Sequence, residues 1–480
     1  MKKAAKTHGR IYTPDFIVRN ILDMCGYEGE KVLGKYVIDN SCGDGAFLIE
    51  VVRRYCIAAQ AASMSNTDIA GHLTNFVHGI EIDPTQADIC RKNLDKLAAS
   101  YGVFCVRWNI ICGNALIIRD FDNKMDFVVG NPPYVRVHNL DENYCAVKSF
   151  TFTQGGMTDL FIVFYEIGLN MLNENGVLGY ITPSSIFNSL AGKTMRQHLL
   201  HNKSLRSVVD LKHFQPFAAT TYTAILLLGK TPNDIVRYFE YDAENLEPFA
   251  VSELGYEDFV ISGNFVFGSK PELAEFKQIA SIKPAKPAFV VKNGFATLFD
   301  DFFIGDYDFD EHTIPIIKAS TGKITRCLYP YDNHGNIVPY EILAQNPQIH
   351  KHYEKHEERL KKRALDKDAP WHGFGRSQGI KDVYRQKFAI NTLIRNVNDI
   401  KLQPCPPRTG VYSGLYILTD YGFDELRSIL CSDDFVKYIS QLGKYKSGGY
   451  YTFSSKDLAQ YLNYMHAEGG GFENGQFTLS

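Results

Sequence analysis

The chain lacks several features that mark whole classes of protein. Its ten cysteines stand singly and none forms a Cys-x-x-Cys pair, so neither a zinc cluster nor a disulfide framework is expected. No apolar run approaches the roughly 18 residues of a membrane span. The basic start, Met1-Lys2-Lys3, is not followed by the apolar segment of a signal peptide. We therefore expect a cytoplasmic protein with mostly free, buried thiols.

The chain also lacks an excess of basic residues. Its formal net charge is −3, whereas many nucleic-acid-binding proteins are strongly basic. The total does not exclude such a partner, because binding depends on local charge. Hydrophobic residues make up 45% of the 480 residues, enough for large cores in two or three domains.

Short apolar runs alternate with helix-like segments between residues 36 and 228. This alternation predicts an α/β fold with a doubly wound, mostly parallel sheet, in which ligands bind beyond the carboxyl ends of the strands. The expected strands are Tyr36–Asp39, Phe76–Ile82, Arg107–Cys112, Asp126–Gly130, Val177–Ile181, Ser207–Leu211 and Tyr222–Leu228. The expected helices include Gly45–Ala62, Thr85–Tyr101 and Leu160–Leu172.

The alternation fades after Pro232. We expect one domain over residues 1–232 and a mixed α+β region, as one or two domains, over residues 233–480. The Gly-rich tail, Gly469–Ser480, is expected to be loose.

A glycine turn follows the first expected strand, at Asp39-Asn40-Ser41-Cys42-Gly43-Asp44-Gly45. Glycines let the backbone approach a ligand, with the N–H groups of the next helix facing it. Asp39 suits a cationic ligand. Leu48 stands where a dinucleotide site needs its third glycine, and no Gly-Lys-Ser/Thr of a phosphate loop follows.

Polar residues also end the next two strands. Glu81, followed by Ile82, can accept bonds from both ribose hydroxyls, and Asn114, followed by Ala115, can read the edge of an adenine ring. Alone, each is weak evidence, and an isolated Glu81 is more often a surface carboxylate. Together with the glycine turn they indicate a cofactor that contains adenosine without phosphates.

The fourth strand leads into Asn131-Pro132-Pro133-Tyr134. The prolines stiffen the turn and remove two N–H donors. The Asn131 side-chain oxygen and the Pro132 carbonyl remain as acceptors for an exocyclic amino group, and Tyr134 adds a flat face. Bonding both amine hydrogens makes the nitrogen lone pair available to attack a sulfonium methyl in line, with positioning carrying most of the rate. The alternative is a packed Pro-Pro turn with a structural tyrosine.

These motifs resemble the gamma class of DNA adenine-N6 methyltransferases, the TaqI-like family with its NPPY motif. The resemblance is dense over residues 9–230. It implies a Rossmann-like domain that binds S-adenosyl-L-methionine over residues 1–232, followed by a target-recognition domain that binds double-stranded DNA over 233–480. It implies site-specific methylation of adenine N6 after base flipping, as the modification methylase of a restriction-modification system or a solitary methylase. A DNA partner would place the protein at the bacterial nucleoid.

The resemblance also assigns cofactor residues. Gly9-Arg10-Ile11-Tyr12-Thr13-Pro14 is similar to the motif that closes over the cofactor, and Asp159–Phe164 to the motif that packs on its adenine. Where Asn114 stands, the family usually has Asp. The implied cofactor contacts are Tyr12, Thr13, Pro14, Asp39, Cys42, Gly43, Gly45, Glu81, Ile82, Asn114, Ala115, Leu160 and Phe164. For Leu160 and Phe164 an ordinary core helix is an equal alternative.

A second aromatic face is expected from the stretch Phe214–Ala224. By its spacing from Thr223, Phe217 would stack on the target base opposite Tyr134, as a flipped base requires. The alternative is a core phenylalanine. The implied catalytic set is thus Asn131, Pro132, Pro133, Tyr134 and Phe217.

Basic and aromatic residues interleave between residues 351 and 388. Basic side chains can neutralise phosphates, and we select Arg376, Lys381 and Arg385 as candidate DNA contacts. For Glu354–Arg363 a solvated helix face is an equal alternative. The segments Trp371–Gly379 and Ser447–Phe453 resemble parts of the family's recognition domain.

Other functions stay open. A protein glutamine-N5 or RNA methyltransferase shares the cofactor loop and tetrapeptide, but lacks a role for Tyr12-Thr13-Pro14, Phe217 and the long C-terminal half. A fused nuclease is not expected, since the motifs start at residue 9 and Glu275-Phe276-Lys277 with Asp258 is a weak match to a nuclease motif. A cognate endonuclease would then be a separate protein. No metal is expected.

Overall fold

The structure is a computed structural model that describes residues 12–136, 144–154, 159–217, 221–367 and 369–468. Parts of three segments named above, Gly9–Ile11, Ala218–Thr220 and Gly469–Ser480, lie outside these residues. The chain forms two compact units, Met1–Ala274 and Glu275–Ser480.

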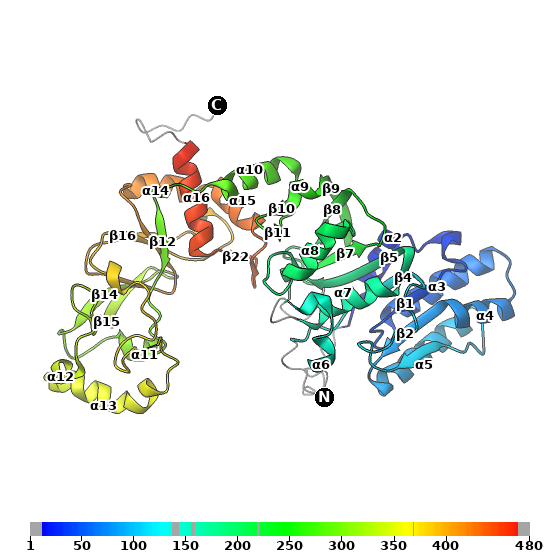
Figure 1. Cartoon of the computed structure of the whole chain (residues 1–480), viewed down its shortest axis with the longest axis horizontal. Helices are drawn as coiled ribbons and strands as arrows, with labels where there is room; N and C mark the ends of the chain where they lie inside the picture. Colours follow the sequence, from blue (N-terminus) through cyan, green and yellow to red (C-terminus); the bar gives the residue numbers. More distant parts are fainter. Residues whose placement is uncertain (1–11, 137–143, 155–158, 218–220, 368, 469–480) are drawn as a thin grey trace. The chain divides into compact units, whose positions relative to one another are not determined.

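A nine-stranded sheet organises the first unit, in the order β3-β2-β1-β4-β5-β7-β6-β8-β9 (Figure 1). The strands are β1 (Val37–Asp39), β2 (Val77–Glu81), β3 (Asn109–Cys112), β4 (Met125–Gly130), β5 (Leu172–Pro183), β6 (Leu205–Asp210), β7 (Thr223–Leu228), β8 (Ile235–Asp242) and β9 (Glu247–Gly255). Strands β3, β2, β1, β4 and β5 run parallel, and β7 is antiparallel to both β5 and β6. This confirms the expected doubly wound α/β sheet, with all seven expected strands in place.

Helices lie on both faces of this sheet. They are α2 (Asp15–Cys25), α3 (Ala46–Ala61), α4 (Asn66–Phe76), α5 (Pro84–Ser100), α6 (Tyr144–Val147), α7 (Leu160–Met171), α8 (Lys193–Asn202) and α9 (Tyr256–Phe259). Helices α2 to α5 share one buried core with β1, β2 and β4. Residue Gly179 of β5 shows how closely α2 packs, because a Cβ there would lie 2.5 Å from Cys25 Sγ. On the other face, α7 packs against Leu178 and Tyr180.

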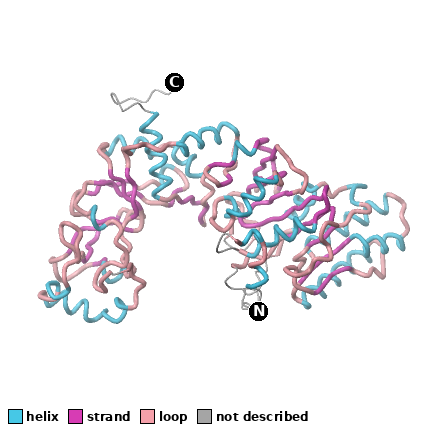
Figure 2. The backbone as a smooth tube through the Cα atoms, viewed as in Figure 1, coloured by secondary structure: helices cyan, strands magenta, loops and turns pink. Residues whose placement is uncertain are grey.

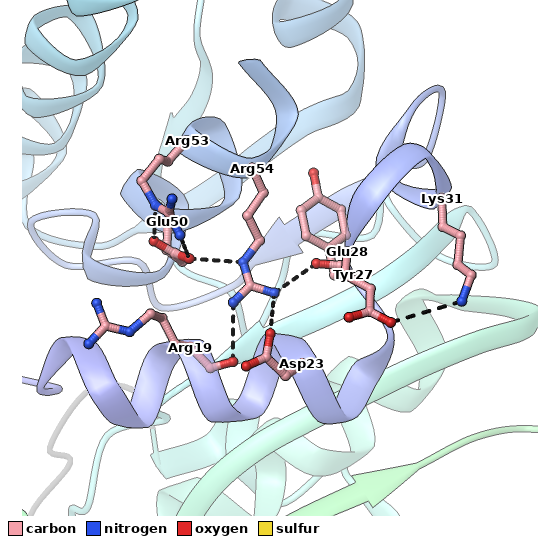
Figure 3. A network of polar contacts seen from close by, with 8 residues as sticks. All are labelled: Arg19, Asp23, Tyr27, Glu28, Lys31, Glu50, Arg53 and Arg54. Carbon is pink, nitrogen blue, oxygen red and sulfur yellow. Dashed lines mark hydrogen bonds and ion pairs between the residues drawn. The ribbon is translucent and has the colours of Figure 1, made fainter. Parts of the chain in front are cut away.

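An arginine fastens α2 to α3 (Figure 3). The Arg54 guanidinium donates to Glu50 Oε1 at 2.9 Å, to Asp23 Oδ1 at 2.7 Å and to the carbonyls of Tyr27 and Arg19 at 2.9 and 3.3 Å. Burial would raise the pKa of Glu50, but hydrogen bonds from Arg53 and Arg54 outweigh it and lower that pKa. These bonds connect the helix that follows Thr13 with the helix that follows the glycine loop.

The sheet does not end where the first domain was expected to end. Strands β8 and β9 add to it after Pro232, with β8 parallel to β6 and antiparallel to β9. Two short strands follow, β10 (Val260–Ile261) and β11 (Asn264–Phe265). The compact unit therefore reaches Ala274, because residues 235–255 are needed to continue the sheet.

The second unit is built from short strands, helices and long loops (Figure 2). Its sheets have the orders β12-β20-β16-β18, β13-β15-β14-β19 and β17-β22-β21. The strands are β12 (Val290–Asn293), β13 (Ile304–Gly305), β14 (Thr313–Lys318), β15 (Lys323–Leu328), β16 (Lys387–Ile390), β17 (Leu393–Ile394), β18 (Leu402–Cys405), β19 (Gly410–Tyr412), β20 (Leu415–Leu418), β21 (Tyr445–Lys446) and β22 (Tyr450–Thr452). The helices are α10 (Lys270–Ser281), which crosses the boundary, α11 (Asp300–Phe303), α12 (Tyr340–Leu343), α13 (Pro347–Lys361), α14 (Phe423–Leu430), α15 (Asp433–Gln441) and α16 (Ser455–Glu468). The mixed α+β region is confirmed.

The second unit contains two segments for which the sequence left an alternative open, Glu354–Arg363 and Glu275-Phe276-Lys277. Helix α13 carries most of the stretch Glu354–Arg363, with Tyr353 and Leu360 buried and its charges largely exposed. In Glu275-Phe276-Lys277, Glu275 pairs with Lys437 at 3.1 Å and Phe276 stacks on Tyr438 at 5.4 Å, which favours a packing role. No helix within the described ranges is long and apolar enough to cross a membrane.

Candidate active site

The chemistry-bearing residues of the first unit gather at one edge of the sheet. Strands β3, β2, β1 and β4 are consecutive neighbours and parallel, so their carboxyl ends lie together. Asp39 and Glu81 end β1 and β2, and Asn131 directly follows β4. The predicted cofactor and catalytic motifs are thus brought to the same edge.

The glycine loop is tied back into the protein. The Cys42 N–H donates to the Ile80 carbonyl at 3.0 Å, the Gly43 N–H to Glu81 Oε2 at 2.9 Å, and the Gly45 N–H to the Cys42 carbonyl at 2.8 Å. Gly45 has φ 96°, and a Cβ there would lie 2.9 Å from Cys90 Sγ, so a glycine is required. These three N–H groups are already bonded, so the loop offers a close backbone surface rather than these donors.

Glu81 organises the loop and keeps capacity for a ligand. Its second oxygen accepts the Asp83 N–H at 2.9 Å. Each carboxylate oxygen has a further lone pair that can accept a hydroxyl hydrogen. The neighbouring Ile82 side chain is 48% exposed, which leaves an apolar surface beside the acid. This combination fits a ribose with an adjoining flat ring.

Asp39 is buried at the centre of this edge, with 2% of its surface exposed. Its Oδ1 accepts the Ser41 N–H at 3.0 Å, and a Cβ on Gly130 would lie 2.8 Å from the same oxygen. Burial raises the pKa of Asp39 to about 7, because a carboxylate loses hydration there. A cationic ligand would offset that cost. The carboxylates of Asp39 and Glu81 together therefore fit an adenosine cofactor that carries a sulfonium group.

For the remaining predicted cofactor residues, the structure shows local hydrogen bonds and burial. The Asn114 Oδ1 accepts the Leu116 N–H at 3.0 Å, Ala115 is buried, and Tyr12 is 66% exposed. Leu160 and Phe164 are buried in α7, as either a core helix or a packing surface would require. The Pro14 carbonyl begins α2 by accepting the Ile17 and Val18 N–H groups.

Asn131 has one half of its amide satisfied and the other half open. Its Nδ2 donates to Thr13 Oγ1 at 3.0 Å. Its Oδ1 is buried and has no hydrogen-bond partner among the described residues. A buried acceptor without a partner costs free energy, and such atoms in native proteins call for an explanation. This oxygen has the capacity to accept a hydrogen bond from a ligand.

Tyr134 is held by its hydroxyl and by two aromatic neighbours. The hydroxyl donates to the Ile181 carbonyl at 3.1 Å, and burial raises the pKa of Tyr134. Its ring meets Phe161 at 6.2 Å and 73°, and Phe217 at 6.4 Å and 80°. Phe217 is 7% exposed and belongs to the core. The two expected stacking rings are therefore neighbours, but they are perpendicular rather than two parallel faces.

The candidate DNA residues differ in how far they are already engaged. Arg376 donates to the Ala364 and Gly375 carbonyls at 2.5 and 3.1 Å and pairs with Asp366 at 3.3 Å. Arg385 pairs with Asp382 at 3.3 Å. Lys381 is exposed.

Sequence reasoning missed the contact between Thr13 and Asn131. The two residues are 118 positions apart, and no pattern in either motif indicates that they meet. It also missed the Ile181 carbonyl as the partner of Tyr134.

Comparisons with known proteins find relatives among restriction-modification methylases. Residues 56–217 match the family of Eco57I restriction-modification methylases. The type II methyltransferase M.BstVI of Geobacillus stearothermophilus is 28% identical, over 89% of this chain and 84% of that protein. M.PaeR7I of Pseudomonas aeruginosa is 24% identical, over 76% and 70%. The restriction enzyme and methyltransferase RM.Eco57I of Escherichia coli is 25% identical, over 48% and 29%.

A solved structure shares the fold over most of the chain. It is the type IIL restriction-modification enzyme MmeI in complex with DNA, with a TM-score of 0.61 and 14% identity, covering 92% of this chain and 63% of that one. These methyltransferase relatives support S-adenosylmethionine as the methyl donor. The chain is therefore an S-adenosylmethionine-dependent methyltransferase, similar to the type II methyltransferases of restriction-modification systems.

Proposed function

We propose that this protein methylates the N6 amino group of adenine at a specific sequence in double-stranded DNA, after the base has been flipped out of the duplex. The observation that carries the proposal is the buried, unpartnered Oδ1 of Asn131 at the carboxyl end of β4. An exocyclic amine supplies the donor that this oxygen lacks. The gamma-class motifs support adenine as the base that presents it.

In this proposal each residue of the site has a separate role. Bound S-adenosylmethionine supplies an activated methyl group. Asn131 Oδ1 and the Pro132 carbonyl accept hydrogen bonds from the two amine hydrogens, so the nitrogen lone pair is available for in-line attack on the methyl carbon. The bond from that carbon to the sulfonium sulfur would break as the C–N bond forms, S-adenosylhomocysteine would leave, and the methylated nitrogen would release one proton to water. Asp39 and Glu81 hold the cofactor next to this acceptor pair. Tyr134, fixed by the Ile181 carbonyl, offers its ring to the base, and Phe217 has to rotate to offer a second face.

DNA as the substrate is supported by the relatives rather than by the net charge. The similar proteins are restriction-modification methyltransferases, and the MmeI structure contains DNA. We propose that residues 233–480 include the recognition region, with Arg376, Lys381 and Arg385 as candidate contacts. In this role the protein is a modification methylase with a separate cognate endonuclease, or a solitary methylase.

The test is methyl transfer from labelled S-adenosylmethionine to unmethylated bacterial DNA, followed by digestion and mass identification of the nucleosides. We expect N6-methyladenine with the wild type. Asn131→Ala is expected to lower the rate on the order of 10²- to 10³-fold, as for loss of one transition-state hydrogen bond. The matched control is Asn175→Ala, an exposed residue near the opposite end of β5, which should keep the wild-type rate.

Other products would redirect the proposal. N4-methylcytosine would keep DNA as the substrate and refute adenine. Label in protein or RNA but not in DNA would favour the glutamine-N5 or RNA reaction, which uses the same acceptor pair.

A further inference from the structure

The side chain of Thr13 is built into the catalytic turn. Its hydroxyl oxygen accepts the Asn131 Nδ2 hydrogen at 3.0 Å, and Thr13 is only 3% exposed. It directly precedes Pro14, the residue that begins α2. Residues Ile17 and Ile21 of α2 are fully buried, so the position of Thr13 is fixed by a helix packed on the sheet.

The hydrogen bond holds Nδ2, the half of the Asn131 amide that the proposed chemistry does not use, and thereby orients Oδ1, the half that it does use. An asparagine amide rotates freely about its last bond unless a partner holds it, because that torsion is broad. With one N–H bonded to Thr13, the amide plane is fixed. The bond also polarises the amide and makes Oδ1 a stronger acceptor. This oxygen is the one left without a partner.

We infer that Thr13 is a positioning residue for methyl transfer: its hydroxyl fixes and polarises the Asn131 amide so that Oδ1 accepts the target amine. The inference rests on the proposed function of Asn131. It assigns Thr13 a role beyond the cofactor contact that its motif implies, and it links the N-terminal segment directly to the reacting group.

The experiment compares Thr13→Val, Thr13→Ala and Thr13→Ser with the wild type. Val keeps the shape and removes the hydroxyl, Ala removes both, and Ser keeps the hydroxyl alone. Initial rates on unmethylated genomic DNA give kcat and the KM for S-adenosylmethionine, and calorimetry gives the cofactor Kd. Thermal unfolding sets an assay temperature below the midpoint of every variant.

We expect Val and Ala to lower kcat about 10- to 100-fold, as misplacement of a reacting group does, with the cofactor KM and Kd within about twofold of the wild type. Ser should restore kcat to within severalfold, since it can accept the same hydrogen. A merely structural role would not separate kcat from KM or follow the hydroxyl.

Three results would overturn the inference. An unchanged kcat in Val and Ala would show that the hydrogen bond does not serve transfer. A raised cofactor Kd with wild-type kcat at saturation would make Thr13 only a cofactor contact. An equal loss in Ser would assign the effect to the lost methyl group. Failure of the proposed function itself looks different: the wild type would make no N6-methyladenine, or Asn131→Ala would keep the full rate.

Discussion

At the scale of single residues, burial of the Asp39 carboxylate lowers the free energy of unfolding of the free protein, and a bound cation would recover that loss. Asp39 is buried with a pKa of about 7, well above that of an exposed aspartate. Between the unfolded pKa of about 4 and pH 7, the folded protein holds a proton on Asp39 that the unfolded chain has released. The contribution of Asp39 to the free energy of unfolding therefore falls as pH rises through this window.

We predict that Asp39→Asn stabilises the free protein at pH 8 while weakening cofactor binding. Asn keeps an oxygen for the Ser41 N–H and removes the buried charge. The gain should reach at most ~4 kcal/mol, from about 1.4 kcal/mol for each unit of pKa shift, and should vanish near pH 4. Thermal unfolding at pH 5 and 8 measures it.

Cofactor binding gives the opposite sign. A cationic ligand favours the ionised form of Asp39, so the wild-type Kd for S-adenosylmethionine should rise as pH falls below 7, and this dependence should be absent in Asp39→Asn. A pH-independent wild-type Kd between pH 5.5 and 8 would contradict this role for Asp39.

At the scale of elements, the site depends on two helices that reach it from different motifs. Helix α2 starts next to Thr13, and α3 starts at Gly45 of the glycine loop. Arg54 joins them through four hydrogen-bonding partners (Figure 3). Its side chain is 11% exposed and that of Glu50 is 12% exposed, so this pair is shielded from solvent.

We predict that Arg54→Met lowers the free energy of unfolding by about 3 kcal/mol, because it removes the better shielded of the two arginines that hold the partly buried Glu50 and the donor to the Tyr27 carbonyl. Denaturant unfolding measures the change. The control is Arg53→Met, which removes a 40% exposed partner of the same Glu50 and should cost about 1 kcal/mol or less. Equal losses in both variants would show that the bridge between the helices contributes nothing.

At the scale of the whole molecule, the compact units divide after Ala274, not at residue 232. Strands β8 and β9 were not expected because exposed and half-buried residues interrupt their apolar pattern and no helix separates them. Their fully or almost fully buried residues, Val236, Tyr238 and Leu254, nevertheless complete the edge of the sheet.

We predict that a fragment ending at Ala274 folds cooperatively and binds S-adenosylmethionine with a Kd within about threefold of the full chain. A fragment ending at residue 232 should aggregate or lose cooperative unfolding, since it exposes strand β6 as an unprotected edge. Circular dichroism and calorimetry compare the two. Equal behaviour of both fragments would place the boundary at residue 232.

The second unit yields a prediction about DNA. Because Arg376 is bonded to two backbone carbonyls and Asp366, Arg376→Ala should lower stability by about 1–2 kcal/mol. Lys381 is exposed, and Lys381→Ala should instead weaken DNA binding uniformly across sequences and reduce the salt slope by about 1. Binding isotherms at several salt concentrations test this. An unchanged slope would remove Lys381 from the interface.

The sequence by itself determined seven of the nine strands of the sheet and the order of the motifs along them. Seven apolar runs, several of them separated by helical periods, specify seven strands locally, and each motif sits at a strand end because its polar and glycine residues interrupt the apolar run. Tertiary structure alone decided what these motifs do to one another. The bond from Asn131 to Thr13, the raised pKa of Asp39 and the perpendicular rings of Tyr134 and Phe217 all depend on packing between distant segments. Local sequence carries no record of that packing, because burial and hydrogen-bond partners are set only when the chain has folded.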